Sequence, residues 1–174
     1  MLVKVCWNVG VRFESAPLHC SAMPWHEVVV CPPSTHTQRI VSPTSITGST
    51  TGPPGGFVLR FSNGLTAYLS GDTGITADQD LVVRGHYKAN LAVMNIGGFP
   101  FTTGPVEATY VVNDLVKPNS VIASHANEPA TIGGKVTPNS KTAAFIKAAK
   151  MPVHVPLSGK TMEFDGSGKC VGGC

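Results

Sequence analysis

Three polar side chains of metal-binding type stand directly after apolar stretches of the sequence: Asp72, His125 and His19. Active sites of layered α/β proteins are assembled in the loops beyond the carboxyl ends of strands. A carboxylate and two imidazoles that converge there can hold a divalent metal ion, which lowers the pKa of a bound water and makes it a nucleophile near neutral pH. The alternative is a purely structural role: Asp72 would cap a turn, and His125 would cap a helix or form hydrogen bonds within its loop.

Other enzyme classes are disfavoured by motifs that the sequence lacks. It has no Gly-x-Ser-x-Gly elbow, no Gly-x-Gly-x-x-Gly and no Walker motif, which argues against a serine hydrolase and against a nucleotide cofactor. None of the five cysteines forms a Cys-x-x-Cys pair, so we expect no zinc ribbon. Reduced thiols are the expected state, with a Cys170–Cys174 disulfide as the alternative.

Composition restricts the partners. The 174 residues fit one domain, and a net charge of +3 without a basic run argues against nucleic-acid binding. Pro, Gly or a charged residue interrupts every apolar run, so we expect no membrane span. The N-terminus lacks the long apolar region of a signal peptide, so we expect none. These features predict a soluble, cytoplasmic protein of one domain.

The organisation of the chain changes near Gly52. Residues 1–54 form a divergent segment, of which 20–54 are rich in Pro, Ser and Thr and are expected to be poorly ordered apart from a short strand at Glu27–Cys31. Residues 55–170 carry strong patterns, and 171–174 form a Gly/Cys tail. We therefore expect the fold to be specified mainly by residues 55–170.

That region alternates predicted strands and helices, which indicates a layered α/β protein. Asn63-Gly64 predicts a tight hairpin with positive φ at both residues. Gly104, Pro105 and Glu107 predict a helix start, and Ala108, Val111, Val112 and Leu115 have the spacing of a buried face. The predicted strands are 57–61, 65–69, 91–95, 120–123, 153–155 and 161–164, and the predicted helices are 78–88, 105–117 and one after Pro138 with Phe145 inward and Lys141 outward.

Five blocks in this region resemble, in order and spacing, the C-terminal half of the metallo-β-lactamase superfamily, especially its small metal-dependent hydrolases. The blocks are Gly56-Phe-Val-Leu-Arg-Phe61, Tyr68-Leu-Ser-Gly-Asp-Thr-Gly74, Asn95-Ile-Gly-Gly98, Thr103-Gly-Pro-Val-Glu-Ala-Thr-Tyr110 and Lys117-Pro-Asn-Ser-Val-Ile-Ala-Ser-His125. The resemblance implies an α/β fold, an αββα sandwich that is N-terminally truncated here, with a metal site at one edge. It also implies that Asp72 is the metal-bridging carboxylate and His125 the last histidine ligand.

The sequence departs from the family at its first metal motif, His-x-His-x-Asp-His, which is absent. His19 is the candidate for the family's middle histidine, and His36 is the alternative. A truncated or frame-shifted gene would explain the missing motif and the divergent 20–54. With so few ligands we expect one ion, held by Asp72, His125 and a third ligand; the resemblance implies zinc, and the incomplete set leaves manganese, magnesium or calcium open.

The resemblance further implies a metal-dependent hydrolase. Small members of the family cleave esters and lactones, such as N-acyl-homoserine lactones; phosphodiester and then β-lactam hydrolysis are the alternatives. A different reading is a catalytically inactive, self-associating remnant of the fold. An uncovered apolar sheet face predicts a homodimer or larger homo-oligomer with Phe57, Leu59 and Leu91 among its contacts.

Five further residues have a predicted structural role. His154 is expected to be a core histidine with its hydrogen bonds satisfied, and Gly97-Gly98 a tight turn. Asn127 and Glu128 follow His125 in sequence and are candidate hydrogen-bond partners for it.

Overall fold

The structure is a computed structural model that describes residues 3–7, 11–15, 37–41, 55–98 and 102–174. For the first three of these ranges it describes the backbone only. The strand predicted at Glu27–Cys31 lies outside the described residues. No helix in the described ranges has the length and apolar character needed to cross a membrane.

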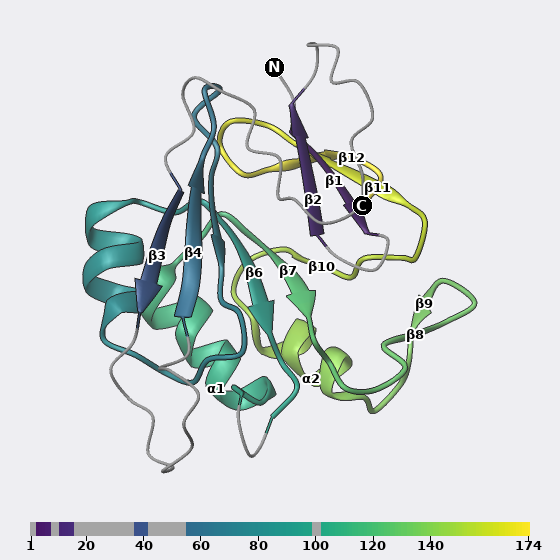
Figure 1. The fold of residues 1–174 in the computed structure, drawn as a ribbon. Helices are drawn as coiled ribbons and strands as arrows, with labels where there is room; N and C mark the ends of the chain where they lie inside the picture. The colour runs from purple at the N-terminus through teal and green to yellow at the C-terminus, as the bar shows by residue number, and fades with distance from the viewer. Residues whose placement is uncertain (1–2, 8–10, 16–36, 42–54, 99–101) are drawn as a thin grey trace.

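A six-stranded sheet forms the centre of the fold, in the order β10-β7-β6-β5-β4-β3 (Figure 1). Strands β5, β6, β7 and β10 are mutually parallel, whereas β4 runs antiparallel to β5, and β3 antiparallel to β4. The bounds are β3 Thr37–Val41, β4 Gly55–Arg60, β5 Thr66–Leu69, β6 Leu91–Asn95, β7 Ser120–Ser124 and β10 Val153–His154. The parallel strands bring the loops after β5, β6 and β7 to one edge of the sheet.

A second, antiparallel sheet has the order β12-β11-β1-β2 and joins the two ends of the chain. Its strands are β1 Val3–Trp7, β2 Val11–Ser15, β11 Thr161–Phe164 and β12 Cys170–Gly172. A short hairpin, β8 Thr131–Ile132 and β9 Lys135–Val136, projects from the body (Figure 1).

Four helical segments lie together on one face of the six-stranded sheet. They are η1 Gln79–His86, α1 Pro105–Tyr110, η2 Val111–Val116 and α2 Lys141–Ala148. Strand residues that alternate along the chain divide between two cores: Tyr68, Ala92 and Met94 pack against the helices, and Ala67, Leu91 and Val93 pack with Met162 and Phe164 of β11. The described residues therefore form three layers of the expected αββα sandwich: helices, sheet and second sheet.

The helix predicted to start at Gly104 is confirmed, but its last turns are wider than an α-helix. Gly104 is the N-cap, Pro105 follows at the first turn, and the Lys117 N–H bonds to the carbonyl oxygen of Val112, five residues back. The wider turn shifts the buried face by one residue. Val116 is therefore buried, and Leu115, which the pattern placed inward, is only half-buried.

The hairpin between β4 and β5 forms where Asn63-Gly64 predicts it, with a different turn. Gly64 has φ of +96°, but Asn63 has no positive φ, so the predicted two-residue turn is wrong. The Gly64 N–H bonds to the Phe61 carbonyl and the Phe61 N–H to the Leu65 carbonyl, which closes a three-residue loop ending in a left-handed glycine.

Two further expectations are corrected. Leu91 is 0% exposed in the core shared with β11, so it lies on no uncovered face and is unavailable as an oligomer contact. Cys170 and Cys174 form a disulfide, rather than the reduced thiols that the sequence favoured.

Candidate active site

Asp72 and His125 meet at the carboxyl-terminal edge of the parallel strands, as the sequence predicts. Asp72 follows β5 and His125 follows β7, with β6 between them. The Asp72 Oδ1 lies 2.6 Å from the His125 Nδ1, and the side chains are 65% and 40% exposed. A carboxylate and an imidazole are therefore held in contact at a surface that water and a substrate can reach.

Asn95, at the end of β6, fixes the loop that carries Asp72. It is 2% exposed, and its Nδ2 donates to the carbonyl oxygens of Gly71 at 2.7 Å and Thr73 at 3.0 Å. The Thr103 hydroxyl donates to the Asn95 carbonyl oxygen at 2.8 Å and also contacts its Oδ1. A buried amide with these partners holds the backbone on both sides of Asp72 in one geometry.

The His125 loop leaves β7 through a left-handed backbone. His125 has φ of +47° and Asn127 φ of +54°, which are uncommon values for residues with a Cβ. A Cβ added at Gly97 would lie 2.6 Å from the His125 carbonyl oxygen and 2.7 Å from the Asn127 Nδ2. Because it has no side chain, Gly97 lets the loop after β6 pack closely against the His125 loop after β7. The Gly97-Gly98 turn therefore helps to shape the site.

Lys141, predicted to face solvent, instead reaches this turn. Its Nζ donates to the Gly97 carbonyl oxygen at 2.6 Å. Lys141 is the first residue of α2, whose N-cap Ser140 accepts a hydrogen bond from the Ala143 N–H at 3.0 Å. The helical pattern alone could not reveal this contact, because Gly97 is remote in sequence.

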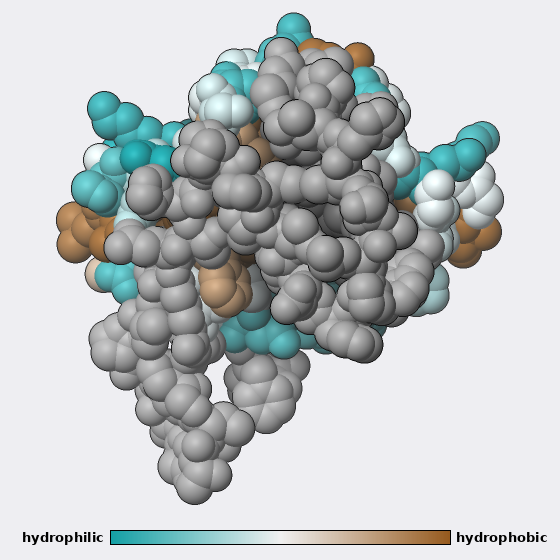
Figure 2. All heavy atoms as spheres, turned by 45° about the horizontal axis from the view of Figure 1, so that its top comes forward, coloured by the Kyte–Doolittle hydropathy of each residue, from teal (hydrophilic) through white to brown (hydrophobic). Residues whose placement is uncertain are grey.

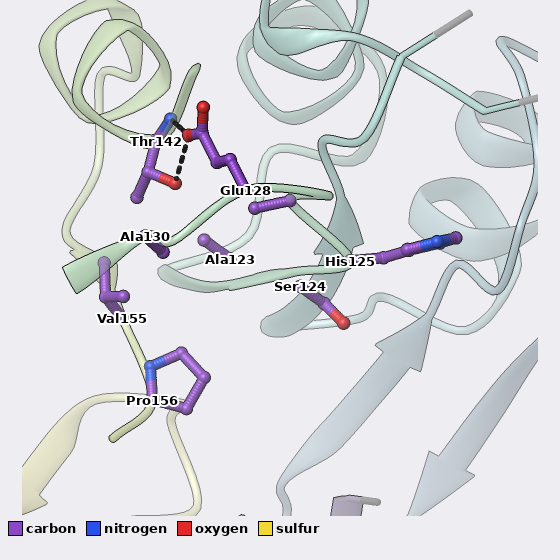
Figure 3. Close-up of a pocket in the computed structure, with 9 residues that line it drawn as sticks. Ala123, Ser124, His125, Glu128, Ala130, Thr142, Val155 and Pro156 are labelled. Atoms are coloured by element: carbon purple, nitrogen blue, oxygen red, sulfur yellow. Dashed lines mark hydrogen bonds between the residues drawn. The ribbon is translucent and has the colours of Figure 1, made fainter. Parts of the chain in front are cut away.

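Glu128 caps the same helix. The sequence suggested that it would bond to His125, but its side chain bonds to Thr142 instead. Its Oε1 accepts from the Thr142 N–H at 2.9 Å and from the Thr142 hydroxyl at 3.1 Å. Partial burial acts to raise the pKa of Glu128, but these hydrogen bonds and the charge of Lys141 hold it below its ordinary value. In Figure 3 the His125 side chain extends away from the Glu128–Thr142 pair. Glu128 is therefore an ionised group beside the site.

A small cavity adjoins the base of the His125 loop (Figure 3). Its volume is about 160 Å³, which is near the size that holds a benzene-sized group. The lining has no Lys or Arg and is mostly small or apolar: Ala123, Ser124, His125, Ala126, Glu128, Ala130, Thr142, Val155 and Pro156. This space suits a short apolar substituent better than an anion.

The described residues supply two of the ligands that the resemblance implies. His19 and His36, the candidates for a third, lie outside the described ranges. Two ligands of one zinc ion are roughly 3.3 Å apart in a tetrahedral site, so a small rotation of the exposed Asp72 and His125 side chains would admit an ion. The donor types thus fit a divalent metal, while a catalytic zinc site takes three protein ligands, one more than the described part of the site provides.

Known proteins resemble this chain in sequence and in fold. No protein-family model matches the sequence. The chain is 35% identical over 113 residues to a UPF0173 metal-dependent hydrolase of Cupriavidus necator. The aligned region covers 65% of this chain and 38% of that protein. The chain is 43% identical over 79 residues to a UPF0173 metal-dependent hydrolase of Caldivirga maquilingensis, covering 45% of this chain and 33% of that one.

Two solved structures show the same fold. Igni18, a metallo hydrolase of Ignicoccus hospitalis, matches with a TM-score of 0.54 at 25% identity, over 74% of this chain and 53% of that chain. A possible metal-dependent hydrolase of Veillonella parvula gives the same TM-score and coverage at 22% identity. The chain spans about 38% of the length of the first curated relative. Its C-terminal part is similar in sequence to the UPF0173 metal-dependent hydrolases, and the chain has the metallo-β-lactamase fold.

Proposed function

We propose that the protein is a metal-dependent hydrolase of a small, uncharged ester or lactone, such as an N-acyl-homoserine lactone. The observation that carries the proposal is the contact between Asp72 Oδ1 and His125 Nδ1, 2.6 Å apart at the carboxyl ends of parallel strands. The chain's sequence relatives are metal-dependent hydrolases, and the contact joins the two residues that the family resemblance assigns to the metal.

Asp72 and His125 would hold the ion. When bound, the ion lowers the pKa of water and polarises the substrate carbonyl. The chain itself positions these ligands: Asn95 holds the loop of Asp72, and Gly97 admits the loop of His125 at short range. In the neutral tautomer that donates from Nδ1 to Asp72 Oδ1, His125 would carry its free lone pair on Nε2.

The charge of the neighbouring cavity supports a neutral substrate. Its lining contains no cation, and its acidic group, Glu128, has a pKa held below the ordinary value and stays ionised. A phosphodiester would meet repulsion there without the Arg or Lys that phosphate sites use. The cavity of about 160 Å³ instead suits a short acyl or ring substituent.

The test measures metal content and hydrolysis on the same protein samples. We expect the purified chain to bind zinc or manganese and to cleave p-nitrophenyl acetate or a short-chain homoserine lactone faster than bis-p-nitrophenyl phosphate. Asp72→Ala and His125→Ala should each abolish both properties with an unchanged far-UV circular dichroism spectrum. Asp114→Ala and His86→Ala, at exposed positions on helices η2 and η1, are the matched controls.

The second candidate function is the inactive remnant. The observation that favours it is that the described residues offer two ligands at the site, where a catalytic zinc ion takes three. A folded parent chain with neither metal at this site nor hydrolysis would establish the remnant. Metal and activity that survive both substitutions would place the site elsewhere.

A further inference from the structure

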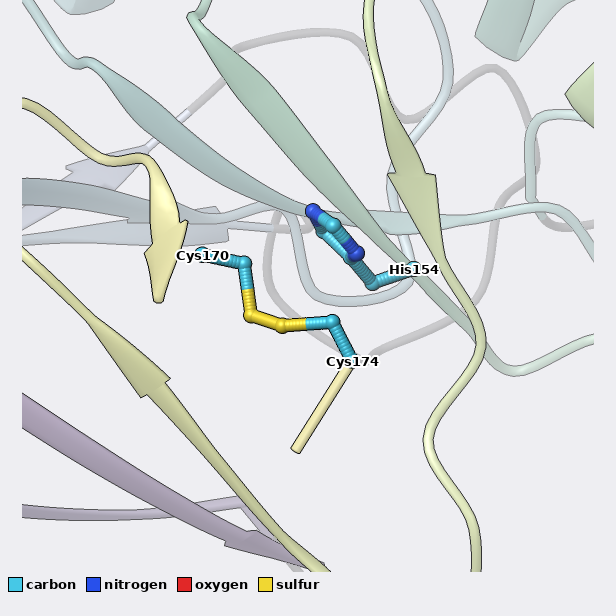
Figure 4. A group of neighbouring side chains, drawn as sticks. All are labelled: His154, Cys170 and Cys174. Carbon is cyan, nitrogen blue, oxygen red and sulfur yellow. A yellow bond between two sulfur atoms is a disulfide. The ribbon is translucent and has the colours of Figure 1, made fainter. Parts of the chain in front are cut away.

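A second group of metal-binding side chains lies where the edges of the two sheets meet. A ring nitrogen of His154 and the Sγ atoms of Cys170 and Cys174 all lie within 4.8 Å of one another. His154 is on β10, the edge of the six-stranded sheet, and Cys170 is on β12, the edge of the second sheet. Figure 4 shows the histidine ring and the two sulfur atoms on neighbouring segments.

His154 is not the satisfied core histidine that the sequence predicts. Its Nε2 is buried and has no hydrogen-bond partner. Its ring packs edge-on against Phe164, with centroids 5.6 Å apart, and Phe164 pairs with Cys170 across β11 and β12. A buried imidazole nitrogen without a partner is costly, so a ligand that bonds to this ring would remove a penalty.

The cysteines are joined by a disulfide across a sequence separation of 4. Cys174 is exposed, so a reductant can reach the bond, while Cys170 packs against the core that contains Phe164. In the disulfide-bonded structure the Gly172 carbonyl oxygen lies 3.5 Å from the Cys170 Sγ and 3.3 Å from the Cys174 Sγ. Reduction would convert this bond into two thiols beside the imidazole of His154.

We propose that the reduced chain binds a zinc ion through His154, Cys170 and Cys174, and that this ion links the edges of the two sheets. Thiolate and imidazole ligands favour zinc over magnesium, calcium or manganese. In a tetrahedral zinc site, ligand atoms lie roughly 3.5 to 3.8 Å apart, which the observed cluster reaches by small side-chain shifts. Disulfide formation removes both thiolates, so the oxidised chain cannot hold the ion.

The environment of His154 favours the ligating form. Burial lowers the pKa of His154 below its ordinary value, so the neutral imidazole that binds metals dominates near neutral pH. The thiols must lose their protons when the ion binds, which makes uptake release protons to solvent.

The experiment uses the full chain carrying His125→Ala, which removes the first site, and compares reduced with oxidised protein. A phosphine such as TCEP supplies the electrons: with one water, phosphine and disulfide give phosphine oxide and two thiols. We expect about one zinc ion per reduced chain, none per oxidised chain, and a higher melting temperature with zinc only in the reduced sample.

Variants assign the ligands. Cys170→Ser, Cys174→Ser and His154→Ala should each lose the zinc, whereas His86→Ala and Cys6→Ser should keep it. Cobalt added to the reduced His125→Ala chain should produce thiolate-to-cobalt charge-transfer absorption, a readout that requires no variant of the cluster. No zinc uptake by the reduced chain, no charge-transfer band, or uptake unaffected by the cysteine substitutions would overturn the proposal. None of these outcomes bears on hydrolysis at Asp72 and His125.

Discussion

The side-chain amide of Asn95 donates a hydrogen bond to the Thr73 carbonyl oxygen at 3.0 Å and so ties the loop of Asp72 to strand β6. Asn95→Ala removes this bond and the one to Gly71, and leaves a small void in a buried position. We expect the free energy of unfolding to fall by about 1–3 kcal/mol, measured by urea titration. Metal content at the Asp72–His125 site should fall as well.

Asn113→Ala is the matched control for Asn95. Asn113 has two side-chain hydrogen bonds, to the backbone of Ala148 and Lys150, and both are exposed to solvent. Its loss should cost less than that of Asn95, because water replaces the missing partner. Equal effects of the two substitutions would show that Asn95 has no special role.

Gly97→Ala tests the close approach of the two site loops. The added Cβ would lie 2.6 Å from the His125 carbonyl oxygen, so the His125 loop must move. We expect a lower melting temperature and loss of metal binding at the Asp72–His125 site. Gly74→Ala is the control, because nothing lies within 4 Å of the Cβ position there and the melting temperature should stay near that of the parent.

Gly64→Val tests the hairpin between β4 and β5. The nearest atom to an added Cβ is 3.5 Å away, so the expected cost comes from the φ of +96° rather than from a clash. We expect a loss of on the order of 1–3 kcal/mol in unfolding free energy. Gly74→Val has neither a positive φ nor a near neighbour, and a melting temperature lowered equally in both variants would refute the strain argument.

The capping role of Glu128 predicts a pH dependence. Its pKa is lower in the folded chain than its ordinary value of 4.5, so the unfolded chain binds the proton more tightly. The stabilisation is therefore present above the ordinary pKa and is lost as the pH falls through the folded pKa. Glu128→Gln should flatten the dependence of melting temperature on pH in this acidic range. An identical profile in parent and variant would contradict the capping role.

The meeting of Asp72 and His125 could be predicted because both follow apolar strand patterns whose carboxyl ends share one edge of a parallel sheet. The clamp by Asn95 could not, because its partners Gly71 and Thr73 lie 24 and 22 residues away and depend on the register of β5 and β6. Lys141 was misplaced for the same reason: helical periodicity gives the buried face but not the contacts made beyond the end of the helix.

The proximity of His154 to Cys170 and Cys174 could not be predicted from the sequence either. It depends on β10 and β12 being the edges of different sheets that come together in the fold. Val116 rather than Leu115 is buried because the Lys117 N–H bonds to the Val112 carbonyl oxygen, five residues back. The spacing of apolar residues does not predict this wider turn. Local pattern thus predicted the strands and helices from β4 to β11, apart from the hairpin of β8 and β9, but it did not predict strands β1, β3 and β12. Long-range register decided the contacts.

Self-association of the chain remains a prediction. The contact surface that we expect is smaller than the sequence suggested, because one of its three predicted residues is buried. Leu91 is buried, but Phe57 on β4 is 42% exposed and Leu59 lies two residues along the same strand. In Figure 2 the described hydrophobic residues of one face are in separate brown areas beside hydrophilic ones. We therefore expect a weak homodimer through β4, with dissociation that is measurable in the micromolar range.

Light scattering over a dilution series tests this expectation on the purified chain. Phe57→Lys should shift the equilibrium to the monomer of 18.2 kDa, since it places a charge in the proposed contact. Leu81→Lys is the control, because Leu81 on η1 is exposed on the helical side of the six-stranded sheet. A parent chain that stays monomeric at every concentration, or a dimer that survives Phe57→Lys, would rule out this contact.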